Sequence, residues 1–359
     1  MNDILGLDTT ELRMLAQQEG EPLYRGNQLA EWVYRRGVRT FNSMSNLPKT
    51  LQTKLTNKYE VDQSRILALQ QSRDGSVKLL LEMKDDARVE TVGLPYADRF
   101  SCCLSTQVGC PIGCIFCASG QGEFVRSLQP GEIVAQVLTI NEIIASGVIQ
   151  TNSRSRQIDH IVIMGMGEPL LNYDSTIKAI RLLNNEVGIG SRHITISTAG
   201  IIPGILKLSR EKIQLTLAIS LHAPNDELRS QIIPGISNKW SITETINASR
   251  EYVRQTGRRV TFEYCLLAGI NDRTQEAREL VMILAGLNCH VNLIRYNPVP
   301  GLPFCAPSQV KVRQFRDILK RAGIQVTQRV QRGSDIAAAC GQLKWHIDML
   351  QSAPDKGQN

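Results

Sequence analysis

The pattern of apolar and polar positions divides the chain at about residue 100. Before that point, apolar residues recur every three or four positions, as they do in amphipathic helices. Three segments have this spacing: 10–20, 25–37 and 46–59. Thr9 and Thr10 are expected to cap the first helix, and Pro48 stands at the start of the third. We therefore predict a helical accessory domain over residues 1–76.

Two strand-like runs, 77–83 and 87–95, follow this helical region. Both are rich in Val and Leu, and the polar turn 84–86 joins them. Such a pair of runs around a short polar turn predicts a β-hairpin. We expect this hairpin to form an extension over residues 77–98.

From residue 99 onward, short apolar runs alternate with amphipathic helical segments. The strand-like runs are 101–107, 160–165, 193–198, 215–222, 260–267, 290–297 and 324–330. The helical segments are 131–147, 242–257, 272–286 and 309–323. Repeated strand and helix segments favour right-handed βαβ units and a parallel sheet. Functional groups then belong at the carboxyl ends of the strands.

Composition narrows the classes of protein. A chain of 359 residues that is 42% hydrophobic can bury a large core. It has no basic and apolar leader typical of a signal peptide, and no apolar run long enough to cross a membrane, so we expect a cytoplasmic protein. Lys plus Arg exceeds Asp plus Glu by 41 − 34 = +7, which suits a polyanionic partner such as RNA. The basic residues of the helical region are either an RNA-docking surface or a solvated helical face.

Three of the nine cysteines lie close together in the segment STQVGCPIGCIFCASG. Cys110, Cys114 and Cys117 have Cys-x3-Cys-x2-Cys spacing, directly after the first predicted parallel strand. In a reducing cytosol, clustered cysteines indicate a metal site or catalysis rather than disulfides. Three thiolates suit a four-iron cluster with one iron left open to a small molecule. A zinc site would need a fourth ligand, from Cys102, Cys103 or a distant histidine.

The cysteine spacing followed by a parallel α/β region resembles the radical S-adenosylmethionine (SAM) superfamily. Further motifs resemble the RlmN/Cfr family of RNA adenine methyltransferases over nearly the whole chain: MGMGEPLLNYD, ISTAG, SLHAPND, VNLIRYNPVPG and RGSDIAAACGQL. The resemblance implies an α/β fold with a partial (β/α)6-type TIM barrel over residues 99–349. This core would include a C-terminal loop with a catalytic cysteine, and residues 350–359 would form a flexible tail.

The same resemblance assigns roles to individual residues. Cys110, Cys114 and Cys117 would bind one [4Fe-4S] cluster per subunit. Two molecules of SAM would be used per turnover, bound by Gly167, Glu168, Ser197, Ser220, Leu221, His222 and Asn297. Cys340 would accept the methyl group, Cys103 would form a disulfide with it to release the product, and Glu90 would accept a proton.

Simpler interpretations of these residues exist. Cys340 stands between Ala and Gly and would pass for a small buried residue, and Glu90 for a surface glutamate on a strand. The other cysteines are predicted to be packing residues: Cys102, Cys265, Cys289 and Cys305.

The implied activity is methylation of C2 of adenosine 2503 in 23S rRNA, before full ribosome assembly, and of adenosine 37 in some tRNAs. The alternative is methylation at C8 of the same rRNA adenosine, because Arg295 stands where C2 enzymes commonly have Pro and because IIPGISNKW departs from the usual run. A non-catalytic iron–sulfur RNA-binding protein is a third hypothesis. We expect a monomer that receives electrons from a flavodoxin or ferredoxin-type partner.

Overall fold

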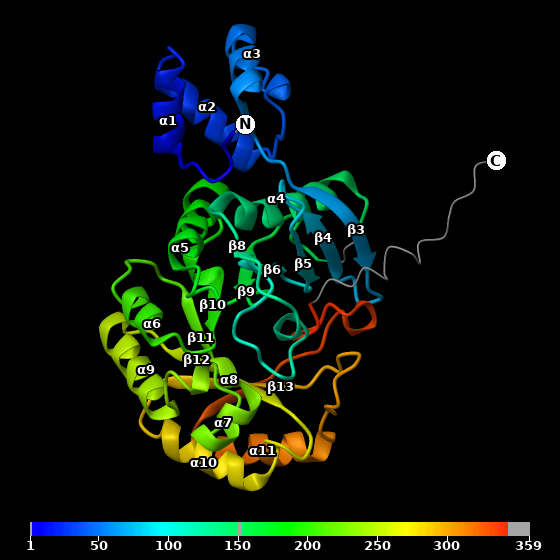
Figure 1. Cartoon of the computed structure of the whole chain (residues 1–359), viewed down its shortest axis with the longest axis vertical. Coiled ribbons are helices and arrows are strands. Elements are labelled where there is room, and N and C mark those ends of the chain that lie inside the picture. The colour runs from blue at the N-terminus through cyan, green and yellow to red at the C-terminus, as the bar shows by residue number, and fades with distance from the viewer. Residues whose placement is uncertain (1, 150–152, 344–359) are drawn as a thin grey trace, which may run out of the picture.

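The computed structural model describes residues 2–149 and 153–343, and a mixed sheet of ten strands organises it (Figure 1). The strand order is β14-β13-β12-β11-β10-β9-β6-β5-β4-β3. Strands β6 and β9 to β14 run parallel to one another. Strands β3, β4, β5 and β6 pair antiparallel in that order, so β6 joins the two parts of the sheet. The sheet does not close, because β14 and β3 remain at its two edges.

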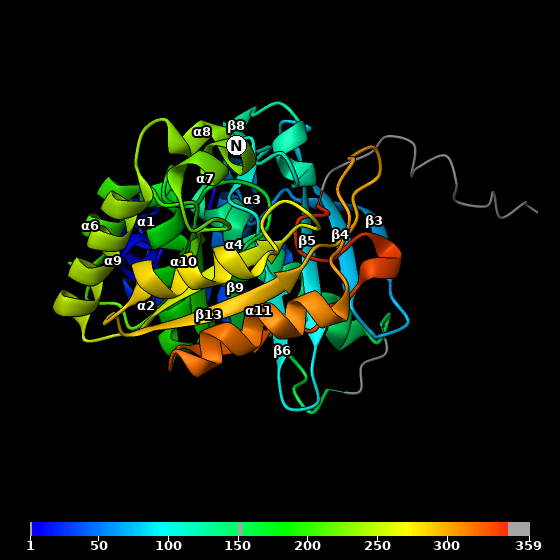
Figure 2. The same ribbon diagram turned by 90° about the horizontal axis from the view of Figure 1, so that it is seen from below.

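The parallel part of the sheet confirms the predicted strand-and-helix alternation. Its strands are β6 (Phe100–Cys103), β9 (His160–Ile163), β10 (Ile194–Thr198), β11 (Thr216–Ser220), β12 (Val260–Leu266), β13 (Cys289–Arg295) and β14 (Gln325–Gln328). The connecting helices are α4 (Pro130–Ser146), α5 (Tyr173–Leu182), α6 (Ile202–Leu208), α7 (Asp226–Ile232), α8 (Pro234–Ser237), α9 (Ile242–Thr256), α10 (Thr274–Leu284) and α11 (Gln309–Arg321). Six strands are each followed by a helical connection within the described residues, as a partial (β/α)6 barrel requires. Figure 2 shows α11 lying along β13 on the outside of the sheet.

The antiparallel part extends further into the sequence than predicted. Strands β4 (Val77–Glu82) and β5 (Arg88–Pro95) form the predicted hairpin. However, β3 (Arg65–Gln71) pairs with β4, so this part of the region predicted to be helical is a strand. Its pattern RILALQQ places Ile66 and Leu69 on an exposed edge, which explains why no buried strand was recognised. All six residues of β4 are buried, because the hairpin continues the main sheet.

The N-terminal helices form a separate layer at one end of the molecule (Figure 1). They are α1 (Thr9–Gln18), α2 (Tyr24–Ala30), a π-helical continuation (Glu31–Arg35) and α3 (Lys49–Lys58). Asp8, rather than Thr9 or Thr10, caps α1, since its carboxylate accepts the Glu11 backbone N–H at 2.9 Å. A short parallel pair, β1 (Asn2–Asp3) and β2 (Tyr59–Glu60), joins the start of this region to its end.

The cysteine-rich segment forms a loop whose two ends pair with each other. β7 (Gln107–Val108) pairs with β8 (Arg126–Ser127), so residues 109–125 form a closed excursion, here called the cysteine loop. Among the described residues, no helix is both long and apolar enough to cross a bilayer. The tail predicted over residues 350–359 lies outside the described residues.

Candidate active site

Two cavities meet at Cys340. The first, here called the cysteine cavity, has a volume of about 130 Å³ and is lined by Cys110, Cys114 and Cys117 together with Cys340. The second, here called the arginine cavity, has a volume of about 300 Å³, and Cys340 lines it too. The predicted metal ligands and the predicted methyl acceptor therefore border a common space, although more than 200 residues separate them in sequence.

The cysteine loop is held in place by close backbone packing. Gly109 has φ +77°, and a Cβ there would lie 2.0 Å from the Glu123 carbonyl oxygen, so only glycine fits. At the far side, the Ile115 N–H donates to the Ile232 carbonyl at 3.1 Å, which joins the loop to α7. Three thiols are thus presented to one cavity by a chain segment with fixed ends.

The donor set fits an iron–sulfur cluster. Burial raises the pKa of the Cys110 thiol to about 12 and the pKa of Cys114 well above its usual value, so deprotonation depends on a metal replacing the protons. In the described part of the chain, no three His, Cys, Asp or Glu side chains surround a single ion position. Zinc bound by thiolates holds the sulfurs about 3.8 Å apart, whereas in a cubane each cysteine binds a different iron and the sulfurs stand further apart. Three thiols that line one cavity fit the ligand set of such a cluster.

Glu168 faces the cysteine cavity from the loop after β9. Its Oε2 accepts the Ala199 N–H at 2.7 Å and its Oε1 accepts the Leu170 N–H at 3.0 Å. Burial raises the pKa of Glu168 to about 7 despite these hydrogen bonds. A cationic ligand would therefore stabilise its ionised form. Gly167 has φ +100° and passes so close to Gln107 that a Cβ would lie 2.6 Å from that side chain.

His222 adds a neutral donor to the same cavity. It adopts φ +59°, a left-handed conformation that is strained for histidine. Its Nδ1 accepts the Cys265 N–H at 2.9 Å, so the proton lies on Nε2. Burial lowers the pKa of His222 to about 3, so the ring stays neutral at physiological pH. Ser197 and Ser220, whose hydroxyls are 3.3 Å apart, line the cavity beside it.

Three predicted site residues lie elsewhere. Leu221 is fully buried and lines neither cavity. Asn297 lines the arginine cavity, where its Nδ2 donates to the Cys340 carbonyl at 2.9 Å. Glu90 lines neither cavity and instead forms a buried ion pair with Lys78, at 3.1 Å.

The segment that carries Cys340, residues 333–343 and here called the carrier loop, is held mainly by side chains of the β3–β4 turn. Asp335 accepts the Ser72 hydroxyl at 2.6 Å and the Arg73 N–H at 3.2 Å. Asp74 accepts the Gly333 N–H at 3.0 Å. Lys78, the partner of Glu90, donates to the Ala337 carbonyl at 3.4 Å. The β3–β4 turn and the start of β4 thus anchor the loop on which the predicted methyl acceptor lies.

The far end of the carrier loop is fastened to the cysteine loop. The Ala118 N–H donates to the Gly341 carbonyl at 2.7 Å, and the Ser119 hydroxyl to the Leu343 carbonyl. Cys340 itself is solvent-accessible within the cavities. The cysteine loop and the carrier loop are therefore in direct contact.

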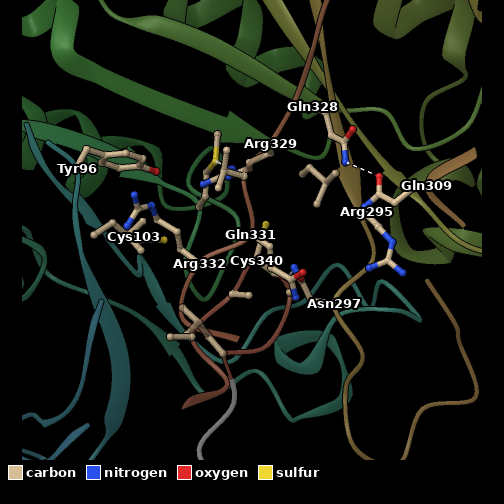
Figure 3. Close-up of a pocket in the computed structure, with 18 residues that line it drawn as sticks. Tyr96, Cys103, Arg295, Asn297, Gln309, Gln328, Arg329, Gln331, Arg332 and Cys340 are labelled. Atoms are coloured by element: carbon tan, nitrogen blue, oxygen red, sulfur yellow. Dashed lines mark hydrogen bonds between the residues drawn. The ribbon is translucent and has the colours of Figure 1, made fainter. Parts of the chain in front are cut away.

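Cys103 lies at the end of β6 and lines the arginine cavity with Cys340 (Figure 3). Both thiols are free, so the disulfide predicted between them is absent from this structure. Cys102 and Cys289 are buried as predicted. Cys305 is exposed, which contradicts its prediction as a packing residue, and the buried Cys265 lines the cysteine cavity.

The sequence analysis did not predict the arginines that line the arginine cavity. Arg329 and Arg332 line it together with Arg295 (Figure 3). The Arg332 guanidinium stacks on the Tyr96 ring at 4.4 Å, and Arg99 stacks on the same ring at 4.3 Å. A signal was available, because Arg329 directly follows the carboxyl end of β14, where functional groups of parallel sheets gather.

Comparisons with known proteins agree with this geometry. Residues 104–281 match the model of the radical SAM superfamily, and residues 2–61 match the ribosomal RNA large subunit methyltransferase N-terminal domain. The fold and the cysteine site therefore define a radical SAM protein, and this superfamily implies an iron–sulfur cluster and SAM.

Relatives over nearly the full length narrow the assignment. Proteins named probable dual-specificity RNA methyltransferase RlmN from Thermosynechococcus vestitus and Gloeobacter violaceus are each 45% identical to this chain over 95% of its length, covering 98% and 94% of those proteins. A radical SAM methyltransferase from Sphaerobacter thermophilus has a crystal structure with TM-score 0.91 and 43% identity, covering 96% of this chain and 99% of that one. The chain belongs to the RlmN family of radical SAM RNA methyltransferases.

Proposed function

We propose that the protein methylates C2 of adenosine 2503 in 23S rRNA, before full ribosome assembly, and adenosine 37 of some tRNAs. It would act as a cytoplasmic monomer, with electrons from a flavodoxin or ferredoxin-type partner. The name of its relatives, which describes an RNA methyltransferase of dual specificity, supports activity on two kinds of RNA.

The arginine cavity suits a nucleotide. Its described lining includes arginines and side-chain amides but no aspartate or glutamate. The amides belong to Asn297, Gln309, Gln328 and Gln331. Arginine binds phosphate, and amides can pair with the edge of adenine. An adenosine taken out of its stack would enter this cavity beside Cys340.

The observation that carries the proposal is the position of Cys340 on both cavities. One [4Fe-4S] cluster, held by Cys110, Cys114 and Cys117, and two molecules of SAM per turnover would supply an electron, a methyl group and a carbon radical. Glu168 would hold the ammonium group of SAM, and Ser197, Ser220 and the Nε2–H of His222 would contact its remaining polar groups. Cys340 would carry the methyl carbon as a thioether between the two cavities.

Cys103 would release the product. Its thiolate attacks the Cys340 sulfur, which breaks the bond from that sulfur to the carbon now attached to adenine. The electron pair stays on that carbon, which takes a proton and becomes the methyl group. The two sulfurs are left joined, and two electrons from the external reductant restore both thiols.

Mass spectrometry of nucleosides tests the proposal directly. RNA incubated anaerobically with the reconstituted protein, SAM and a reductant should contain 2-methyladenosine. Finding 8-methyladenosine instead would establish the C8 alternative, and finding neither would contradict both. A Cys103→Ala variant should accumulate a covalent RNA–protein adduct, whereas a non-catalytic RNA-binding protein would form none.

A further inference from the structure

Arg329 is a cation placed among the reactive sulfurs. Its backbone N–H donates to the Leu293 carbonyl at 2.8 Å, which fixes its Cα beside β13. Its Nη1 donates to the Met164 sulfur at 3.2 Å. Met164 and Cys103 line the same cavity as Arg329. Arg329, after β14, and Cys103, at the end of β6, therefore reach one cavity from opposite edges of the parallel part of the sheet.

Cys340 approaches the same guanidinium from the carrier loop. Arg329, Cys103, Cys340 and Met164 all line the arginine cavity, and Figure 3 shows both cysteines and Arg329 around it. The charges of Cys340, Glu263 and Cys103 would each raise the pKa of Arg329. Glu263 lines the other cavity and accepts a hydrogen bond from Asn292 at 2.9 Å. The two cysteines are the thiols that the proposed reaction uses as nucleophiles.

We propose that Arg329 is the activating cation of both sulfur nucleophiles, stabilising the negative charge on Cys103 and on Cys340 when each loses its proton to water. This inference rests on the proposed function for the roles of the two thiols. Arg329 would act through its positive charge, without carrying the methyl group or binding a metal.

The physical need for such a cation follows from burial. Burial raises the pKa of the Cys103 thiol to about 12, and the charge of Cys340 raises it further, whereas Arg329 and the Met164 N–H lower it. Burial also raises the pKa of Cys340, with Arg329 opposing the rise and Glu263 and Cys117 adding to it. Only a thiolate attacks carbon or sulfur efficiently, so a nearby cation that stabilises the thiolate would speed the attack by either cysteine.

Arg329 suits this task better than its neighbours. Arg332 stacks on Tyr96, and Arg295 donates through Nε to the Pro307 carbonyl at 2.9 Å. Both of these guanidinium groups therefore have partners other than the two thiols. Arg332→Met is therefore a matched control that removes one positive charge from the same cavity.

The test is the pH dependence of thiol alkylation in the anaerobically prepared holoprotein. Iodoacetamide labelling of Cys103, and of Cys340 in molecules where it is a free thiol, is followed by peptide mass spectrometry, with the exposed Cys305 as internal standard. In Arg329→Met, Cys103 should react about tenfold more slowly at pH 9, since one pKa unit is a tenfold change in thiolate. Arg329→Lys should restore the rate to within about threefold, and Arg332→Met should leave it unchanged.

The outcomes separate this inference from the proposed function. Equal rates of Cys103 labelling in Arg329→Met and the wild type would overturn the role of Arg329. A labelling rate in Arg329→Lys as slow as in Arg329→Met would overturn it too. A rise in KM for RNA with unchanged labelling would make Arg329 a phosphate ligand and also overturn it. Labelling needs no turnover, so slower labelling would support the inference even if no methylated nucleoside were found. If Arg329→Met folds poorly, as judged by bound iron, Arg329→Gln provides the neutral comparison.

Discussion

The cysteine loop and the carrier loop are held by different kinds of contact. The cysteine loop is closed at its base by the β7–β8 pair and packed so tightly that Gly109 tolerates no side chain. The carrier loop is held at its start by individual side chains, including Asp335, Asp74 and Lys78, and at its far end by the Ala118 N–H and the Ser119 hydroxyl of the cysteine loop. A hydrogen bond contributes only about 1 kcal/mol, so such contacts can be broken and remade more easily than tight backbone packing. We therefore expect the cysteine loop to keep its position more firmly than the loop that carries Cys340.

The largest effect is expected at the cysteine loop. Cys114→Ala should lose the cluster iron and all detectable methyl transfer, because the loop would keep only two of its three predicted cluster ligands. Iron and sulfide analysis of anaerobically purified protein, together with nucleoside mass spectrometry, provides the measurement. Cys305→Ala, a change at an exposed cysteine, should match the wild type. Wild-type iron content in Cys114→Ala would show that this loop is not the metal site.

The second largest effect is expected at the buried Lys78–Glu90 ion pair, whose lysine contacts the carrier loop. Lys78→Met should lower the free energy of unfolding by about 3–5 kcal/mol, because it leaves the buried Glu90 carboxylate without its lysine partner. Lys78→Met combined with Glu90→Met should recover most of this loss, as measured by urea denaturation. A double variant as unstable as the single one would contradict the ion-pair explanation.

Methylation by the same double variant tests Glu90 as the predicted proton acceptor. Glu90 reaches neither described cavity, so its effect on chemistry has to be separated from its effect on stability. Full activity in the stable double variant would exclude the proton-acceptor role.

A smaller effect is expected from removing a contact that holds the carrier loop. Asp335→Ala removes the hydrogen bonds from Ser72 and Arg73. We expect alkylation of the free Cys340 thiol to become about fivefold faster and methylation to slow by a similar factor, with little change in melting temperature. The matched control is Asp174→Ala, an exposed aspartate far from the carrier loop that pairs with Lys207. Unchanged Cys340 labelling in Asp335→Ala would show that the β3–β4 turn does not restrain the loop.

The smallest effect is expected at Asp74, which holds the start of the carrier loop through the Gly333 N–H. Hydrogen bonds from Ser76, Gly333 and Ser72 outweigh desolvation and lower the pKa of Asp74 to about 2. A carboxylate with a lowered pKa stabilises the fold above its unfolded value near 3.8, and this contribution disappears as pH falls towards 2. Because Asp74 is exposed, the contribution should be below about 1 kcal/mol. Asp74→Asn should therefore flatten the fall in unfolding free energy between pH 5 and pH 2, and an unaltered slope would contradict this account.

Much of the fold and part of the site were predictable from local patterns. The strands from β6 to β14 are short apolar runs followed by amphipathic helices, so their order and direction follow from βαβ geometry. The cysteine spacing predicted three thiols in one place, and positions after strand ends predicted Glu168 and His222 beside them; the structure places all five residues on one cavity. Strand β3 was missed because its apolar residues face outward at a sheet edge, which gives a weak pattern.

The sequence by itself determined the local chemistry: which residues are thiols, where strands end and which loop gathers three cysteines. Only the tertiary structure decided what meets across long separations. It paired Glu90 with Lys78, moved Asn297 to the Cys340 carbonyl and brought Arg329 to the cavity shared by Cys103 and Cys340. The physical reason is that periodicity records which face of an element is buried, whereas the partner on that face depends on how distant elements pack.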